Sequence, residues 1–247
     1  RNKGKQNSGV LYAAKKCGIK EIYSIGGAQA VATLAYGTKK IIKVSKIVGP
    51  GNLYVTTAKK EIFGDVGIDM VAGPSEITVV GDKYSNPNWI ASDLIAQAEH
   101  DEQSQSILIS KDKNIINKVK KLLFYQLNKL PRKSIAMKSL KSNGILISVS
   151  SDQKLIEAIN KIAPEHLELN IKNYKNYVNR ITNAGSIFLG KYSTEAVGDY
   201  LAGTNHVLPT AGSAKFSSGL SVYDFYKRIS YINLSKKGIE TLGPSVI

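Results

Sequence analysis

The stretch EITVVGDKYSNPNWIASDLIAQAEHDEQSQSILISKDKNIINKVKKLLFYQLNKL, residues 76–130, decides the fold of this chain. Two short runs within it, 77–80 and 106–109, have the length and the β-branched, apolar composition of buried strands. The longer stretches that follow them, 87–102 and 114–130, are typical of helices, and apolar residues of the second fall on one helical face. This alternation of strands and helices predicts an α/β protein.

The alternation continues on both sides of this stretch. The expected strands are 21–25, 41–48, 68–72, 145–149, 167–171 and 186–189, and the expected helices are 28–36, 53–63, 153–162 and 174–182. Gly73-Pro74-Ser75-Glu76 interrupts the pattern between two strands, as a boundary between units does. We therefore expect two α/β units, 1–76 and 77–220, with a cleft between them of the kind in which ligands bind.

Composition narrows the class of protein. The formal charge is +15, but only four of the 34 basic residues are arginines, and the lysines are spread along the chain without interleaved aromatics. A nucleic-acid interface is therefore not expected. No apolar run approaches the roughly 20 residues that span a bilayer, and the basic start, 1–9, has no apolar signal core, so we expect a cytoplasmic protein. The single cysteine, Cys17, is expected to be a buried thiol that forms no disulfide.

Two glycine-rich turns precede expected helices. Gly49-Pro50-Gly51-Asn52 could hold an anion, because amides at a helix N-terminus point toward a ligand and glycine permits close approach. The dinucleotide fingerprint is incomplete, since Tyr54 stands where its third glycine would fall. Gly26-Gly27-Ala28-Gln29 is equally ambiguous. On sequence alone, each is either a nucleotide site or a plain tight turn.

The three histidines all lie beside carboxylates or glycines. Gln97 and His100 are three residues apart on an expected helix, so they share a face that could bind a metal ion. Glutamine is an uncommon zinc ligand, and the alternative is that His100 is a solvated surface residue. Glu165 and His166 precede an expected strand, and an adjacent acid and imidazole suit proton transfer, with a charged turn as the alternative. His206 follows Gly203-Thr204-Asn205.

Taken together, five ordered motifs carry a more specific signal than any one of them. They are Val48-Gly49-Pro50-Gly51-Asn52, Ile68-Asp69-Met70 through Ala72-Gly73-Pro74-Ser75-Glu76, Gln97-Ala98-Glu99-His100, Pro164-Glu165-His166-Leu167 and Gly203-Thr204-Asn205-His206. In sequence and order they resemble the motifs of the histidinol dehydrogenase family. The resemblance extends from about Leu11 to Leu242.

The resemblance implies a function and a fold. Members of that family oxidise L-histidinol to L-histidine through an aldehyde, using two NAD⁺ and one zinc per site, in the last steps of histidine biosynthesis. It implies two incomplete Rossmann-like units, of which 1–76 contacts NAD and 77–220 holds zinc and substrate. It also implies a homodimer.

The resemblance further assigns roles to single residues. Gln97, His100 and Asp199 would be zinc ligands, and with Ser75, His166 and His206 they would bind substrate. His166 would be the general base for the alcohol proton, and Glu165 would activate the water that attacks the aldehyde. Gln29 and Asn52 would contact NAD.

Two departures from the family pattern are expected to matter. An N-terminal glycine-rich strand with a tyrosine for NAD has no counterpart before Arg1, and 221–247 resembles only the start of a C-terminal tail that would supply a fourth zinc ligand. We therefore expect units truncated at both ends. The alternative to an active enzyme is a catalytically inactive fragment that keeps the fold and part of the zinc site.

Overall fold

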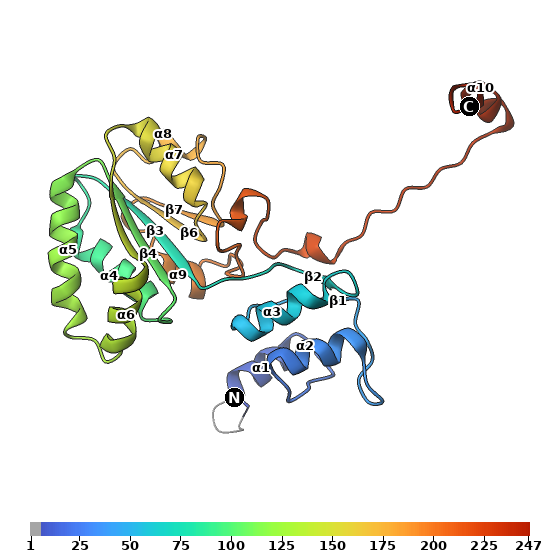
Figure 1. Ribbon diagram of the computed structural model, residues 1–247, viewed down its shortest axis with the longest axis horizontal. Helices are drawn as coiled ribbons and strands as arrows, with labels where there is room; N and C mark the ends of the chain where they lie inside the picture. Colours follow the sequence, from blue (N-terminus) through green and yellow to red (C-terminus); the bar gives the residue numbers. More distant parts are fainter. Residues whose placement is uncertain (1–5) are drawn as a thin grey trace.

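The fold is built around a five-stranded parallel sheet, seen in a computed structural model that describes residues 6–247 (Figure 1). The strands lie in the order β5-β4-β3-β6-β7, and every neighbouring pair is parallel. Their bounds are β3 Glu76–Gly81, β4 Gln105–Ser110, β5 Gly144–Ser148, β6 His166–Asn170 and β7 Ser186–Leu189. We call the part from β3 to β7, residues 76–189, the large unit.

Helices cover both faces of this sheet because side chains alternate between the faces along each strand. On one face, Ile77, Val79 and Leu108 pack against α4 (Pro87–Ala98), α5 (Lys113–Leu127) and α6 (Lys133–Asn143). On the other, Val80 and Leu167 pack against α7 (Asp152–Ile162) and α8 (Lys175–Val178). All six residues of β3 are buried, as expected for the central strand of a doubly covered sheet.

The order of the strands brings the loop before β3 and the loop before β6 next to each other. After β3 it builds outward through β4 to β5, and then returns to place β6 on the opposite side of β3, with Ile77 paired to His166. Because β3 and β6 are parallel, the residues just before each strand lie at the same edge of the sheet. Ser75 and Glu165 are those residues.

A second, smaller α/β unit precedes the large one, and we call residues 27–68 the small unit. Its elements are α2 Gly27–Tyr36, β1 Lys46–Ile47, α3 Leu53–Ile62 and β2 Gly67–Ile68. Strands β1 and β2 are parallel and joined by α3, so they form a β-α-β unit. Its core is small and contains Val31, Ala35, Ile47, Ile62 and Val66.

The helices nearest the two ends of the described chain pack loosely. Helix α1 (Ser8–Lys16) buries none of its residues. After the large unit come α9 (Glu195–Tyr200), the 3₁₀ turns Ser213–Lys215 and Val222–Phe225, α10 (Lys236–Leu242) and a last 3₁₀ turn, Gly243–Ser245. The segment before α10 runs away from the rest of the molecule (Figure 1), and α10 also buries no residue.

Several expected elements differ from those observed. No strand forms at 21–25, whose Ile22, Tyr23 and Ile25 are exposed, because no described segment pairs with it and a strand needs a partner for its backbone groups. The expected strands 41–48 and 68–72 shorten to two residues each, and the expected helix 174–182 shortens to α8. Helix α6 was not expected from the sequence.

The helix expected at 87–102 ends at Ala98, so His100 lies in the turn after α4 rather than on its face. Glu99, Asp101 and Glu102 crowd this end, where negative charge opposes the helix dipole. The Asp101 side chain accepts from the Gln103 amide at 2.9 Å and stabilises the turn instead.

Two further expectations concern the surface. Cys17 is exposed, so the expectation of a buried thiol is wrong; it follows α1, which has no buried face to shield it. Among the helices of residues 6–247, none is long and apolar enough to cross a membrane. Residues 1–5 of the basic start lie outside the described part of the chain.

Candidate functional site

A pocket of about 330 Å³ lies at the edge of the large sheet where β3 and β6 begin. Its walls come from five separate parts of the sequence. The lining residues are Ser75, Gln97, His100, Glu165, His166, Glu195, Asp199, Tyr200 and His206. Every residue that the resemblance assigned to zinc, substrate or proton transfer is therefore in one place, together with two that it did not assign, Glu195 and Tyr200.

The pocket has a buried floor and an open rim. Gln97, Glu165, His166 and Glu195 are all 5% exposed or less. His100, Tyr200 and His206 are exposed, and Ser75 and Asp199 are partly so. A ligand entering past the histidines would therefore meet polar groups that water reaches poorly.

Backbone contacts fix the orientation of Glu165 and His166. The Glu76 amide donates to Glu165 Oε2 at 2.9 Å, and the Glu76 carbonyl oxygen lies 3.2 Å from His166 Nδ1. With Nδ1 protonated and donating to that carbonyl, the lone pair of the imidazole lies on Nε2. Nε2 is buried and has no hydrogen-bond partner among the described residues, so it is free to accept a proton from a ligand.

Burial sets the protonation state of these two groups. It raises the pKa of Glu165 to about 8 against the opposing hydrogen bond from the Glu76 amide, and the nearby carboxylates of Glu76, Glu195 and Asp199 add to the rise. Burial lowers the pKa of His166, so its imidazole is neutral near pH 7. Near pH 7 a protonated Glu165 thus stands beside a neutral His166, whose Nε2 can act as a base.

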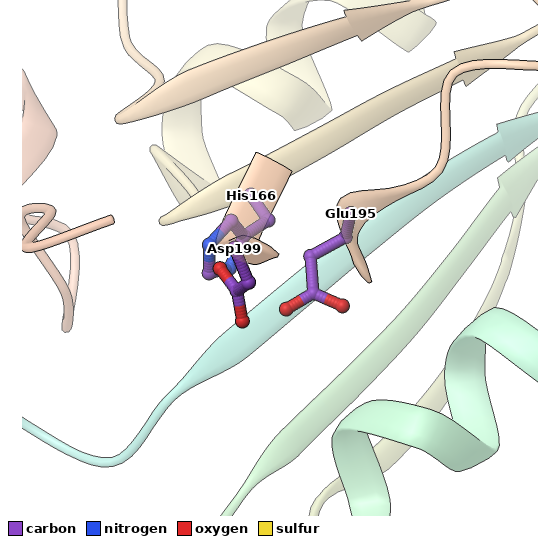
Figure 2. Close-up of side chains that lie close together, drawn as sticks. All are labelled: His166, Glu195 and Asp199. Carbon is purple, nitrogen blue, oxygen red and sulfur yellow. The ribbon is translucent and has the colours of Figure 1, made fainter. Parts of the chain in front are cut away.

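Helix α9 adds two carboxylates to the pocket. Glu195 and Asp199 are four residues apart and share a face of the helix, and Figure 2 shows both beside His166. Donor atoms of His166, Glu195 and Asp199 lie within 4.8 Å of one another, which is close enough to ligate one metal ion. Burial, followed by repulsion from Asp199, raises the pKa of Glu195 to about 7.

Gln97 has an unusual environment. Its side chain is 1% exposed, yet neither Oε1 nor Nε2 has a hydrogen-bond partner among the described residues. An unpaired buried amide costs free energy unless a ligand satisfies it. The amide therefore indicates a bound group that the protein itself does not supply.

The two residues assigned to NAD lie elsewhere. Gln29 is in the first turn of α2, and Asn52 caps the N-terminus of α3, where its Oδ1 accepts from the Val55 amide at 3.2 Å. Both side chains are exposed and neither lines the pocket. The first turns of α2 and α3 contain no acidic residue, so their amides can face an anion.

Glu195 is the main residue of the pocket that sequence reasoning missed. Nothing in Ser193-Thr194-Glu195 marks it as functional, and the expected elements left 190–210 without a helix. The i, i+4 spacing of Glu195 and Asp199 was the available signal.

The fold and the pocket define an α/β protein with an enzyme-like site, in which a buried acid, a neutral imidazole and metal-competent carboxylates meet at one sheet edge. Comparison with known proteins gives the family. A family model described as histidinol dehydrogenase matches residues 1–247. The chain belongs to the histidinol dehydrogenase family, whose members are oxidoreductases of histidine biosynthesis.

Individual relatives agree with this assignment. A histidinol dehydrogenase of Pelagibacter ubique is 70% identical over 246 residues, covering 99% of this chain and 58% of that protein. One of Nitrosomonas europaea is 53% identical over 241 residues, covering 98% of this chain and 56% of that protein. The crystal structure of histidinol dehydrogenase from Elizabethkingia anophelis superposes with a TM-score of 0.89 at 47% identity, covering 96% of this chain and 55% of that one. The chain thus spans little more than half the length of these relatives.

Proposed function

We propose that this chain is the core of a zinc-dependent histidinol dehydrogenase that oxidises L-histidinol to L-histidine through L-histidinal, with two NAD⁺ as hydride acceptors. The observation that carries the proposal is the pocket itself, where residues spread from position 75 to position 206 meet. Family membership supplies the substrate, and the neutral imidazole of His166 suits acceptance of a proton.

In the first oxidation, His166 would accept the alcohol proton on Nε2 while the carbon gives up a hydride. The Glu76 carbonyl would hold the resulting imidazolium through Nδ1, since it already contacts that nitrogen at 3.2 Å. In the second, Glu165 would take a proton from the water that attacks the aldehyde. A carboxyl with a pKa near 8 is a stronger base than an ordinary glutamate once it is ionised.

The donor set fits zinc. Gln97 offers a buried oxygen without a partner, and His100 and Asp199 line the same pocket. We propose these three as ligands, with zinc supplying the positive charge that holds the amino and imidazole nitrogens of the substrate. Ser75 and His206 would contact the substrate from the same pocket wall and rim.

A rival ligand set is available in the same pocket, because the donor atoms of His166, Glu195 and Asp199 also lie within reach of one ion. Zinc content separates the two sets. In full-length protein we expect His100→Asn to lose zinc and Glu195→Gln to keep it, as measured by elemental analysis after dialysis. The opposite pattern would assign the metal to Glu195 and leave His100 as a residue of the rim.

The small unit would bind NAD through Gln29, Asn52 and the N-termini of α2 and α3. Both side chains are exposed, so a shallow and weak site is expected.

We further propose a homodimer in the full-length protein. Its support is the C-terminal segment, where Tyr223, Tyr231 and Ile232 are at least 82% exposed and would be covered by a second copy.

The decisive experiment is an assay of the full-length gene product with L-histidinol, NAD⁺ and added zinc, followed by NADH absorbance. Two NADH per histidinol and histidine as product are expected. No NADH formation by folded, zinc-loaded protein would overturn the proposal. The 247-residue chain, assayed in parallel, should bind zinc weakly and show no turnover, because it spans 58% of the Pelagibacter ubique relative.

A further inference from the structure

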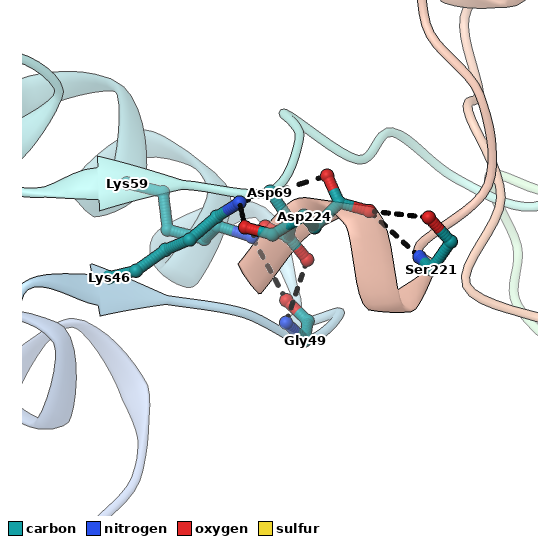
Figure 3. Close-up of polar contacts among 6 residues, drawn as sticks. All are labelled: Lys46, Gly49, Lys59, Asp69, Ser221 and Asp224. Carbon is teal, nitrogen blue, oxygen red and sulfur yellow. Dashed lines mark hydrogen bonds and ion pairs between the residues drawn. The ribbon is translucent and has the colours of Figure 1, made fainter. Parts of the chain in front are cut away.

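The turn at Gly49, which precedes α3, is held by a buried ion pair (Figure 3). Lys59 lies on α3 and Asp69 lies just after β2. Their side chains are 3% and 0% exposed, and Lys59 Nζ contacts Asp69 Oδ1. Charged side chains are rarely buried so completely, so this pair calls for an explanation.

Both ions also bind the backbone of Gly49. Its amide donates to Asp69 Oδ2 at 2.8 Å, and its carbonyl oxygen accepts from Lys59 Nζ at 3.0 Å. Gly49 has φ of +117°, a conformation that residues with a side chain rarely adopt. The ion pair therefore fixes both polar groups of a residue whose backbone would otherwise be free to rotate.

The fixed turn determines where the N-terminus of α3 points. Only Pro50 and Gly51 separate Gly49 from Asn52, the residue that caps α3. Asn52 Oδ1 is already used by the Val55 amide, so the side-chain NH₂ group is the part left for a ligand. In the first turn of α3, Thr56 Oγ1 donates to the Ala72 carbonyl at 2.8 Å and ties the helix to the segment between β2 and β3.

Stability alone is a weak explanation for this arrangement. The free energy needed to remove two charges from water is about as large as the free energy gained from their attraction. Well-packed apolar residues of similar size often replace such pairs without loss of stability. The pair has a role that apolar residues could not take, since only polar or charged atoms can form hydrogen bonds with both the amide and the carbonyl of Gly49.

We propose that Lys59 and Asp69 are positioning residues for the dinucleotide. They set the Gly49 turn so that the Asn52 NH₂ group and the first amides of α3 face the cofactor. The inference rests on the proposed function, because it takes NAD as the ligand of this turn. Neither residue lines the substrate pocket, so we expect their removal to affect the binding of NAD⁺ before that of histidinol.

The test compares three variants of the full-length enzyme: Lys59→Met, Asp69→Asn and the double variant Lys59→Met with Asp69→Leu. For each, KM for NAD⁺, KM for histidinol, kcat, zinc content and Tm are measured. We expect KM for NAD⁺ to rise about tenfold or more in all three, corresponding to about 1.4 kcal/mol or more. KM for histidinol and zinc content should stay within twofold of the parent. Lys60→Met, an exposed lysine of the same helix, is the matched control and should change nothing.

The double variant separates positioning from folding. It removes both charges, so its Tm should lie near that of the parent while its KM for NAD⁺ stays raised. A double variant with normal Tm and normal KM for NAD⁺ would overturn the inference. So would a parallel rise of both KM values together with a fall in Tm, which is the signature of a purely structural pair. A parent enzyme without NAD-dependent turnover would overturn the proposed function and the inference with it, whereas an active parent with unaffected variants would overturn the inference alone.

Discussion

The large and small units are built from the same kind of element but are stabilised differently. The large unit buries a five-stranded sheet between two layers of helices, and its central strand has no exposed residue. The small unit has strands of two residues each, and Leu53, Tyr54 and Phe63 of its helix α3 and the following turn remain exposed. The large unit therefore builds its site on a well-packed sheet, whereas the small unit holds its turn by a few polar contacts.

Polar contacts also join the small unit to the C-terminal segment. Lys46, on β1, donates to the Asp224 carbonyl and lies 3.7 Å from its carboxylate, while Asp224 accepts from the Ser221 amide at 2.7 Å (Figure 3). The Lys46 and Asp224 side chains are 28% and 32% exposed, so this pair is less shielded than Lys59 and Asp69. One buried and one partly exposed ion pair thus stabilise the part of the chain whose apolar core is small.

The largest expected effect is on the site of the large unit. His166→Asn in full-length enzyme removes the base and should lower kcat about 10²- to 10⁴-fold while KM for NAD⁺ changes little. Steady-state kinetics with NAD⁺ varied at saturating histidinol would measure this. An effect confined to KM for NAD⁺ would contradict this role, because it would place His166 in cofactor binding.

The next effect is on stability. Leu108→Ala opens a cavity in a fully buried part of the large unit and should cost about 2–5 kcal/mol, whereas Val31→Ala in the small unit should cost less, because a thin core next to solvent can collapse around the gap. Urea unfolding of the 247-residue chain measures both. Trp89, the single tryptophan, lies on α4 and reports the large unit, so its fluorescence should respond to Leu108→Ala and hardly to Val31→Ala. Equal shifts in both variants would indicate that the units unfold as one.

A smaller effect is expected at the proposed NAD contact. Gln29→Ala should raise KM for NAD⁺ up to about tenfold, since one hydrogen bond at an exposed site contributes about 0.5–1.5 kcal/mol. The kcat at saturating NAD⁺ should stay near that of the parent. A loss of kcat with unchanged KM would show that the small unit takes part in the chemical step.

The smallest effect is expected at an ion pair on the surface of the large unit. Asp152 forms an ion pair with Lys111 and accepts from Tyr177 Oη at 2.7 Å, and these contacts, Lys111 first, lower the pKa of the Asp152 carboxyl. A lowered pKa contributes stability that is present above the ordinary value for aspartate and is lost as the pH falls through the folded value. Because the pair is about half exposed, Asp152→Asn should cost under about 1 kcal/mol at pH 7. The loss of stability caused by Asp152→Asn should disappear near pH 2. Urea titrations at both pH values measure it, and an equal loss at pH 2 would contradict this prediction.

Sequence reasoning predicted the large unit well because burial leaves a clear pattern there. The runs at 77–80, 106–109 and 186–189 are all strands, and the helix expected at 53–63 after the glycine-rich turn is observed as α3. It was wrong at 21–25, where a strand would need a neighbouring strand, and at α6, where the sequence has no apolar stripe. Residues 21–25 have strand composition but no described neighbour to pair with, and α6 buries only Ala136 and Ser139, too little for an apolar stripe.

The site divides in the same way. Motifs located Glu165, His166 and the other assigned residues, but no local pattern could show that Ser75 and His206 line one pocket. Their proximity follows from the order of strands in the sheet. Glu195 was missed because its role depends on the turn that brings α9 over β6, where the Glu195 amide donates to Glu168 Oε1 at 2.8 Å.

The pairing of β3 with β6 also has a consequence for the time course of folding. Glu76 and His166 are 90 positions apart, so the carbonyl that orients the imidazole reaches it only after a long loop has closed. Hairpins and helices form in microseconds, whereas parallel pairing over such a separation is slow. An early species containing β3, β4 and β5 would have a sheet and a hydrophobic core but no pocket. Recovery of zinc binding during refolding should therefore lag behind recovery of helical circular dichroism, which makes the metal a reporter of the last step of assembly.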